Sequence, residues 1–69
     1  MFAKEIVKHL AEHGVYIPMV GYQFFVGLQT CAKVEKLAAI KILRGLNAVP
    51  DLRPEKEAVE WLMTINVKF

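Results

Sequence analysis

Residues 33–46 constrain the fold most, because an α-helix would give this stretch two contrasting faces at about 100° per residue. One face, which continues from the residues just before it, is apolar apart from Glu35: Cys31, Ala32, Val34, Ala38, Ala39, Ile42, Leu43 and Leu46. The other face carries four cations around two large apolar side chains: Lys33, Lys36, Lys41, Arg44, Leu37 and Ile40. A core needs only one apolar face, so the apolar residues among the cations predict a surface that docks a partner.

The length and composition of the chain predict one small domain, residues 1–69. A chain of 69 residues is near the size at which a single core barely outweighs chain entropy, yet 55% of its residues are hydrophobic. Some apolar surface is therefore expected to lie outside the core, under a partner protein or a second copy of the chain, and the sequence leaves both alternatives open. The net charge of +2 is too small to indicate nucleic-acid binding by itself.

Cysteine usage and the apolar runs predict a cytoplasmic protein. Cys31 is the only cysteine, which excludes an internal disulfide and a thiolate metal cluster. The first residues contain no basic region followed by an apolar run. The longest apolar tract, residues 15–28, is interrupted by a proline, two glycines and a glutamine. We therefore expect neither a targeting segment nor a membrane span.

Two further segments have the pattern of amphipathic helices. Residues 2–13 place apolar and charged side chains on opposite faces, and Gly14 is typical of the residue that ends a helix. Pro54 suits the first position of another helix, with Glu55 and Glu57 in the first turn, where the helix dipole favours anions. This second helix would turn an apolar stripe towards the core: Ala58, Trp61 and Leu62.

The remaining segments favour strands. β-branched and aromatic residues dominate residues 15–19 and 22–28, with a turn near Val20 and Gly21, and residues 64–69 alternate apolar and polar side chains. The order α-β-β-α-α-β predicts an α+β two-layer sandwich, in which helices cover one face of a small three-stranded sheet. The alternative is an all-α bundle in which residues 19–46 form one long buried helix, because periodicity does not separate strands from buried helices in apolar runs.

Residues 36–44, Lys-Leu-Ala-Ala-Ile-Lys-Ile-Leu-Arg, resemble the first helix of the C-terminal domain of the bacterial ribosomal stalk protein. That family's helix reads Lys, aliphatic, Ala, aliphatic, Ile, Lys, any residue, aliphatic, Arg. Downstream, residues 56–58 match the family's Lys-Glu-Ala, and residues 65–69 match its following strand. The resemblance covers residues 33–69, and it extends to residues 3–19 only if the sandwich is circularly permuted.

This resemblance implies a sandwich fold and a role in recruiting translation GTPases. It carries that role to five residues: Lys36, Leu37, Ile40, Lys41 and Arg44. Two departures weaken the transfer. The longer segment 47–54 replaces the family's tight glycine-rich turn, and Val59 stands where the family has a lysine of its factor-binding face.

Candidate catalytic and metal-binding residues are few. His9 and His13 stand four residues apart, a spacing that can place two imidazoles on one metal, but the sequence offers no evident third ligand. The sequence offers no evident general base for the thiol of Cys31. It also contains no recognisable Ser/His/Asp set, phosphate-binding glycine loop or carboxylate pair. We therefore expect no catalysis, no metal and no cofactor.

The sequence thus predicts a small non-enzymatic protein-binding module, an adaptor or an inhibitor, that docks an acidic and apolar partner surface. The predicted binding residues are Lys33, Lys36, Leu37, Ile40, Lys41 and Arg44. The alternative is a nucleic-acid-binding module that uses the same basic helix. Salt separates the two, because binding to a nucleic acid weakens steeply as counterions compete, whereas an apolar protein interface persists.

Overall fold

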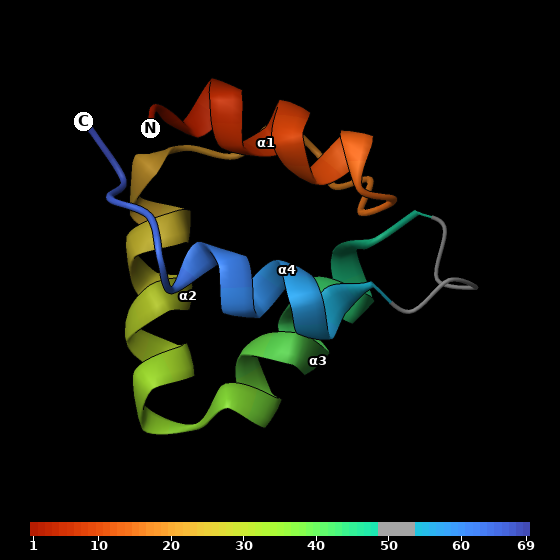
Figure 1. The fold of residues 1–69 in the computed structure, drawn as a ribbon, viewed down its shortest axis with the longest axis vertical. Helices are drawn as coiled ribbons and strands as arrows, with labels where there is room; N and C mark the ends of the chain where they lie inside the picture. The colour runs from red at the N-terminus through yellow and green to blue at the C-terminus, as the bar shows by residue number, and fades with distance from the viewer. Residues whose placement is uncertain (49–53) are drawn as a thin grey trace.

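Four α-helices make up the regular structure of residues 1–48 and 54–69, the part of the chain that the computed structural model describes. They are α1 (Ala3–Glu12), α2 (Tyr22–Val34), α3 (Lys36–Leu46) and α4 (Glu55–Leu62). In Figure 1, α2 runs down one side, and α1, α4 and α3 cross beside it in that order from top to bottom. The chain turns directly from α2 into α3 at the lower corner of that view.

Each helix contributes residues at helical spacing to one core. The core comprises Ile6, Leu10, Val15, Phe25, Leu28, Ala32, Ala39, Ile40, Leu43, Ala58, Val59 and Leu62. Fully burying one large apolar side chain stabilises a fold by about 1.5 to 3 kcal/mol, so this core is the main source of stability for so short a chain. The stripes predicted for residues 2–13 and for the helix after Pro54 agree with it, through Ile6, Leu10, Ala58 and Leu62.

The end of α1 confirms the prediction for Gly14. Gly14 has a φ of 88°, in the left-handed region that favours glycine. Its N–H donates to the backbone oxygen of Ala11 at 3.1 Å, and the N–H of Val15 donates to that of Leu10 at 2.8 Å. These two bonds form a Schellman motif, which satisfies the last carbonyls of the helix and turns the chain back.

The predicted α+β sandwich is wrong, because the described residues contain no sheet. Residues 22–28, expected to be a strand, form the first half of α2. Residues 15–19 are a connection without regular secondary structure, in which the Tyr16 N–H donates to Asn47 Oδ1 at 2.9 Å and the Tyr16 oxygen accepts from the Ala48 N–H at 2.8 Å. Residues 64–69 provide only one isolated parallel bridge, between Lys68 and Phe2. The sandwich fold that the stalk-domain resemblance implied is therefore wrong as well.

The physical reason lies in how α2 is surrounded. Phe25, Leu28 and Ala32 enter the core, while Phe24 and Cys31 pack at its edge, so these five residues form one apolar face of α2 that packs on the rest of the chain. In such a segment the local β-preference of aromatic residues is overridden by tertiary packing. The all-α alternative is therefore closer to the structure than the sandwich is.

The expected continuous helix over residues 33–46 is also wrong, because it breaks at Glu35. Glu35 has extended dihedrals, with φ −150° and ψ 98°, and separates α2 from α3. Val34, which was expected on the inner face, is 86% exposed at the end of α2. The break lets α3 take its own orientation against α2 and α4.

The two ends of the chain meet at one edge of the molecule (Figure 1). The ammonium group of Met1 donates to the backbone oxygen of Asn66, and the Lys68 N–H donates to the backbone oxygen of Met1 at 2.7 Å. Gln29 of α2 holds the nearby end of α4, because its side-chain amide donates to the backbone oxygens of Leu62 at 2.7 Å and Ile65 at 2.9 Å. These carbonyls have no partner within α4, so Gln29 acts as its C-terminal cap.

Candidate functional site

The six predicted binding residues come from two helices. Lys33 lies near the end of α2, on the other side of the Glu35 break, and the other five lie on α3. The side of α3 that faces the core carries Ala39, Ile40 and Leu43.

Ile40 corrects the prediction of an exposed apolar centre made of Leu37 and Ile40. Ile40 is only 7% exposed and belongs to the core, whereas Leu37 is 59% exposed. Ile42, which was expected to face inward, is 43% exposed. Ile40 and Ile42 thus have the reverse of their predicted exposures because of the break at Glu35. The inner face of α3 is set by packing on α2 and α4, and it does not continue the apolar stripe of residues 31–34.

Lys36 is paired with α4. Its Nζ lies 2.5 Å from Oε2 of Glu60, and both side chains are partly exposed. The hydrogen bond from Lys36, together with its charge, lowers the pKa of the Glu60 carboxyl below its ordinary value. This exposed ion pair neutralises one of the four cations that were expected to face a partner.

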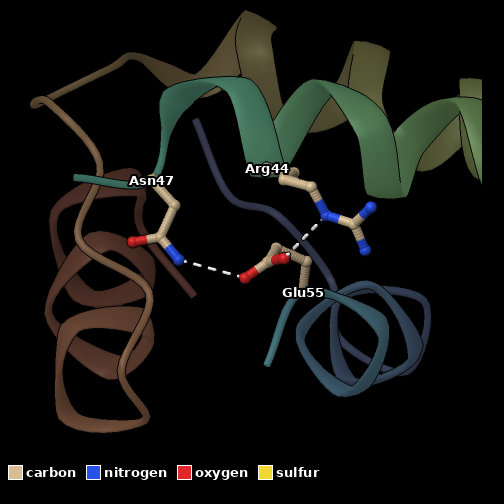
Figure 2. Close-up of polar contacts among 3 residues, drawn as sticks. All are labelled: Arg44, Asn47 and Glu55. Carbon is tan, nitrogen blue, oxygen red and sulfur yellow. Dashed lines mark hydrogen bonds and ion pairs between the residues drawn. The ribbon is translucent and has the colours of Figure 1, made fainter. Parts of the chain in front are cut away.

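Arg44 takes part in a buried polar network that the sequence did not predict (Figure 2). Glu55 at the start of α4 has no exposed surface, and its Oε1 accepts from Arg44 Nε at 3.1 Å. Its Oε2 accepts from Asn47 Nδ2 at 3.0 Å, while Asn47 Oδ1 accepts from the N–H of Tyr16. The network joins the C-terminal end of α3 and the N-terminal end of α4 to the connection before α2. Arg44 therefore has a structural role.

A weak signal for this network was present in the sequence. Asn47 directly follows the last apolar residue of α3, a position where polar side chains often cap a helix, and Glu55 follows Pro54 at a helix start. The dipole argument placed Glu55 correctly in the first turn, but it implied an exposed anion. Nothing in the local pattern indicated that Glu55 would face α3, because its partners lie 8 and 11 residues earlier in the chain.

The exposed side of α3 continues into a groove beside α2. Leu37 and Ile42 lie at the two edges of this side, about 140° apart around the helix axis, with Lys41 between them. Ile42 also borders a shallow groove of about 270 Å³ that is lined from α2 by Phe24 and Gly27. The absence of a side chain at Gly27 leaves the groove open. We call these five residues the docking face. Lys41 forms no hydrogen bond or ion pair with any residue in 1–48 or 54–69, and the same holds for Lys33.

The two histidines are arranged as stacked rings. The centroids of His9 and His13 lie 4.3 Å apart at an interplanar angle of 23°, and His13 Nδ1 is 3.1 Å from the backbone oxygen of His9. Within the described ranges, no group of three His, Cys, Asp or Glu side chains could hold a metal ion. Stacking therefore replaces the convergent arrangement that a shared metal would require.

No described helix combines the length and the apolar character needed to cross a membrane. The longest, α2, has 13 residues, against the roughly 20 that a spanning helix requires. No protein-family model, curated protein or solved structure matches this chain.

Proposed function

We propose that this chain is a small non-enzymatic protein-binding module whose docking face receives an amphipathic helix with apolar and acidic side chains. The observation that carries this proposal is the exposure of Leu37 and Ile42 on either side of Lys41, which pairs with no described residue, together with the apolar groove that Ile42 borders. Apolar helix faces are received by grooves of this kind between two helices. Binding would serve an adaptor or an inhibitor equally well.

Apolar burial and charge would have different roles in this interaction. Covering Leu37 and Ile42 fully would contribute about 1.5 to 3 kcal/mol each, which is the larger share of the affinity. Lys41 and Lys33 would attract an acidic partner and orient it, mainly by raising the rate of association. Lys36 and Arg44 would contribute less, because carboxylates of α4 already pair with them.

The ion pairs that Lys36 and Arg44 form within the chain favour a protein over a nucleic acid as the binding partner. Four unpaired cations on one face would suit a phosphate backbone, but two of the four are neutralised by Glu60 and Glu55. Glu60 is itself exposed and would repel phosphates near Lys36. Nucleic-acid binding by the basic helix is therefore the second candidate, and it predicts a much steeper loss of binding with salt.

The resemblance of residues 36–44 to the stalk helix supports a protein partner as well. Of the five residues to which it carries a docking role, Leu37 and Lys41 are exposed and belong to the docking face. Ile40 is buried, and Lys36 and Arg44 are paired within the chain. Translation GTPases are thus one class of partner to include in a binding test, through these two positions.

Site-specific photo-crosslinking tests the proposal directly. A photo-reactive phenylalanine analogue replaces Leu37 in one variant and Met19 in a matched control, since Met19 is also exposed, at 67%, but lies before α2. After nuclease treatment and at moderate salt, we expect position 37 to give a defined protein adduct that position 19 does not. The purified partner should then bind the wild-type chain, and Leu37→Glu together with Ile42→Glu should abolish that binding.

Two outcomes would overturn the proposal. Identical adducts from positions 37 and 19 would mean that the docking face is ordinary surface. A nucleic-acid adduct in the absence of nuclease, with affinity falling log-linearly as salt rises, would establish the second candidate instead.

A further inference from the structure

A cavity of about 410 Å³ opens between α1 and α4, and none of the residues of the docking face lines it. It is lined by His9 and Leu10 of α1, by His13 directly after α1, by Pro54 directly before α4, and by Glu57, Ala58 and Trp61 of α4. This volume lies within the range of pockets that hold small molecules. Leu10 and Ala58 are 1% and 6% exposed, so the floor of the cavity is apolar and belongs to the core.

Three aromatic rings form one wall of this cavity. The ring of His9 stacks on Trp61 with centroids 3.8 Å apart and an interplanar angle of 9°, and it stacks on His13 with centroids 4.3 Å apart and an interplanar angle of 23°. All three rings are therefore close to parallel. Because two stacked rings at these distances must lie on opposite faces of His9, another flat ring can meet this wall at the ring edges or on the outer face of His13 or Trp61.

Glu57 supplies the charged group of the cavity. Its side chain is exposed in the first turn of α4 and forms no ion pair or hydrogen bond with any residue that the structure describes. An ionised carboxylate only accepts hydrogen bonds, and its two oxygens match a ligand that presents two N–H groups side by side. The same charge disfavours an anionic ligand.

We propose that this cavity binds a small planar aromatic cation, such as an aryl amidinium. The ring of the ligand would lie against the wall of His9, His13 and Trp61, over the apolar floor. Its N–H groups would donate to the carboxylate of Glu57. Ring, floor and carboxylate come from two helices that are separated in sequence, so the site exists only in the folded chain.

Tryptophan fluorescence gives the test, because Trp61 is the only tryptophan of the chain and lines the cavity. The probe is benzamidine, added to the full-length protein at about pH 8, where imidazole in water is an uncharged ring. Benzamide keeps the planar ring but lacks the charge, and cyclohexanecarboxamidine keeps the charge but lacks the planar ring. We expect a saturable fluorescence change with benzamidine and at least several-fold weaker binding of the other two compounds.

Substitution of the carboxylate identifies the site. Glu57→Gln should weaken benzamidine binding about tenfold or more, since it replaces a charge-assisted pair by neutral hydrogen bonds. Glu35→Gln, at an exposed glutamate in the corner between α2 and α3, is the matched control and should leave binding unchanged. Circular dichroism verifies that both variants keep the helical fold, and amide shifts in NMR spectra should be confined to α1 and α4.

The proposal is overturned if wild-type protein shows no saturable response to benzamidine. Equal binding of all three compounds would overturn it too, because neither planarity nor charge would then matter. An unchanged affinity in Glu57→Gln, or amide shifts spread over α2 and α3, would place the binding elsewhere.

Discussion

Arg44 holds the buried carboxylate of Glu55, with 3.1 Å between Arg44 Nε and Glu55 Oε1 (Figure 2). The arginine side chain is half exposed, while the glutamate has no exposed surface. Removing a charge from water is costly unless it is paired and hydrogen-bonded, and Asn47 supplies the second bond to the same carboxylate. A residue that the sequence assigned to a partner thus stabilises the contact between α3 and α4.

Arg44→Ala should therefore destabilise the fold by about 3 kcal/mol, because it leaves a buried carboxylate without its cation. Lys36→Ala removes a cation from the same helix but breaks only an exposed ion pair, so its effect should be small. Urea unfolding followed by circular dichroism measures both. Equal effects of the two substitutions would contradict the structural role of Arg44.

The ion pair between Lys36 and Glu60 should make stability depend on pH in the acid range. The pKa of Glu60 is lowered in the folded chain from an ordinary value of 4.5, so the pair stabilises the fold above that value. The contribution is lost as the pH falls through the lowered pKa. Thermal unfolding of the wild type should therefore lose more stability on acidification than that of Glu60→Gln, and high salt should reduce the difference.

The absence of any difference between these two pH profiles at low salt would show that the pair does not persist in solution. Lys56 also lowers the pKa of Glu60 through its charge, although less than Lys36 does. Lys36→Ala should consequently remove most of the acid dependence of this group, and Lys56→Ala should remove little.

Gln29 should be needed to fix the end of α4 and the segment after it. Gln29→Leu has a similar size but cannot donate to the backbone oxygens of Leu62 and Ile65, which would cost about 1 to 3 kcal/mol. Hydrogen exchange should then speed up at the end of α4. Thr30→Val, at an exposed neighbour whose hydroxyl bonds only within α2, is the control and should change exchange there little.

The isolated chain should be a monomer if the docking face serves a different protein. In a symmetric dimer through this face, Lys41 of one copy would approach Lys41 of the other, which repels. Sedimentation equilibrium should give the mass of one chain, 7.8 kDa. A dimer that Leu37→Glu dissociates would show that a second copy covers the face, the alternative that composition left open.

Local patterns in the sequence determined the elements whose periodicity is unambiguous. The stripe of Ile6 and Leu10 and the terminating Gly14 define α1, and the stripe of Ala58 and Leu62 after Pro54 defines α4. These features are readable because a helix that is apolar on one side only has a clear period, and because few residues other than glycine adopt a positive φ.

Tertiary packing alone decided the rest of the fold and of the candidate site. Residues 22–28 are helical because the face of α2 that carries Phe25 and Leu28 packs into the core, where a local preference for strand counts for little. The break at Glu35 rotates α3, so Ile40 enters the core and Ile42 faces outward. Arg44 meets Glu55 only when α3 and α4 pack together. Such contacts depend on relative orientation of whole helices, which no local pattern of residues contains.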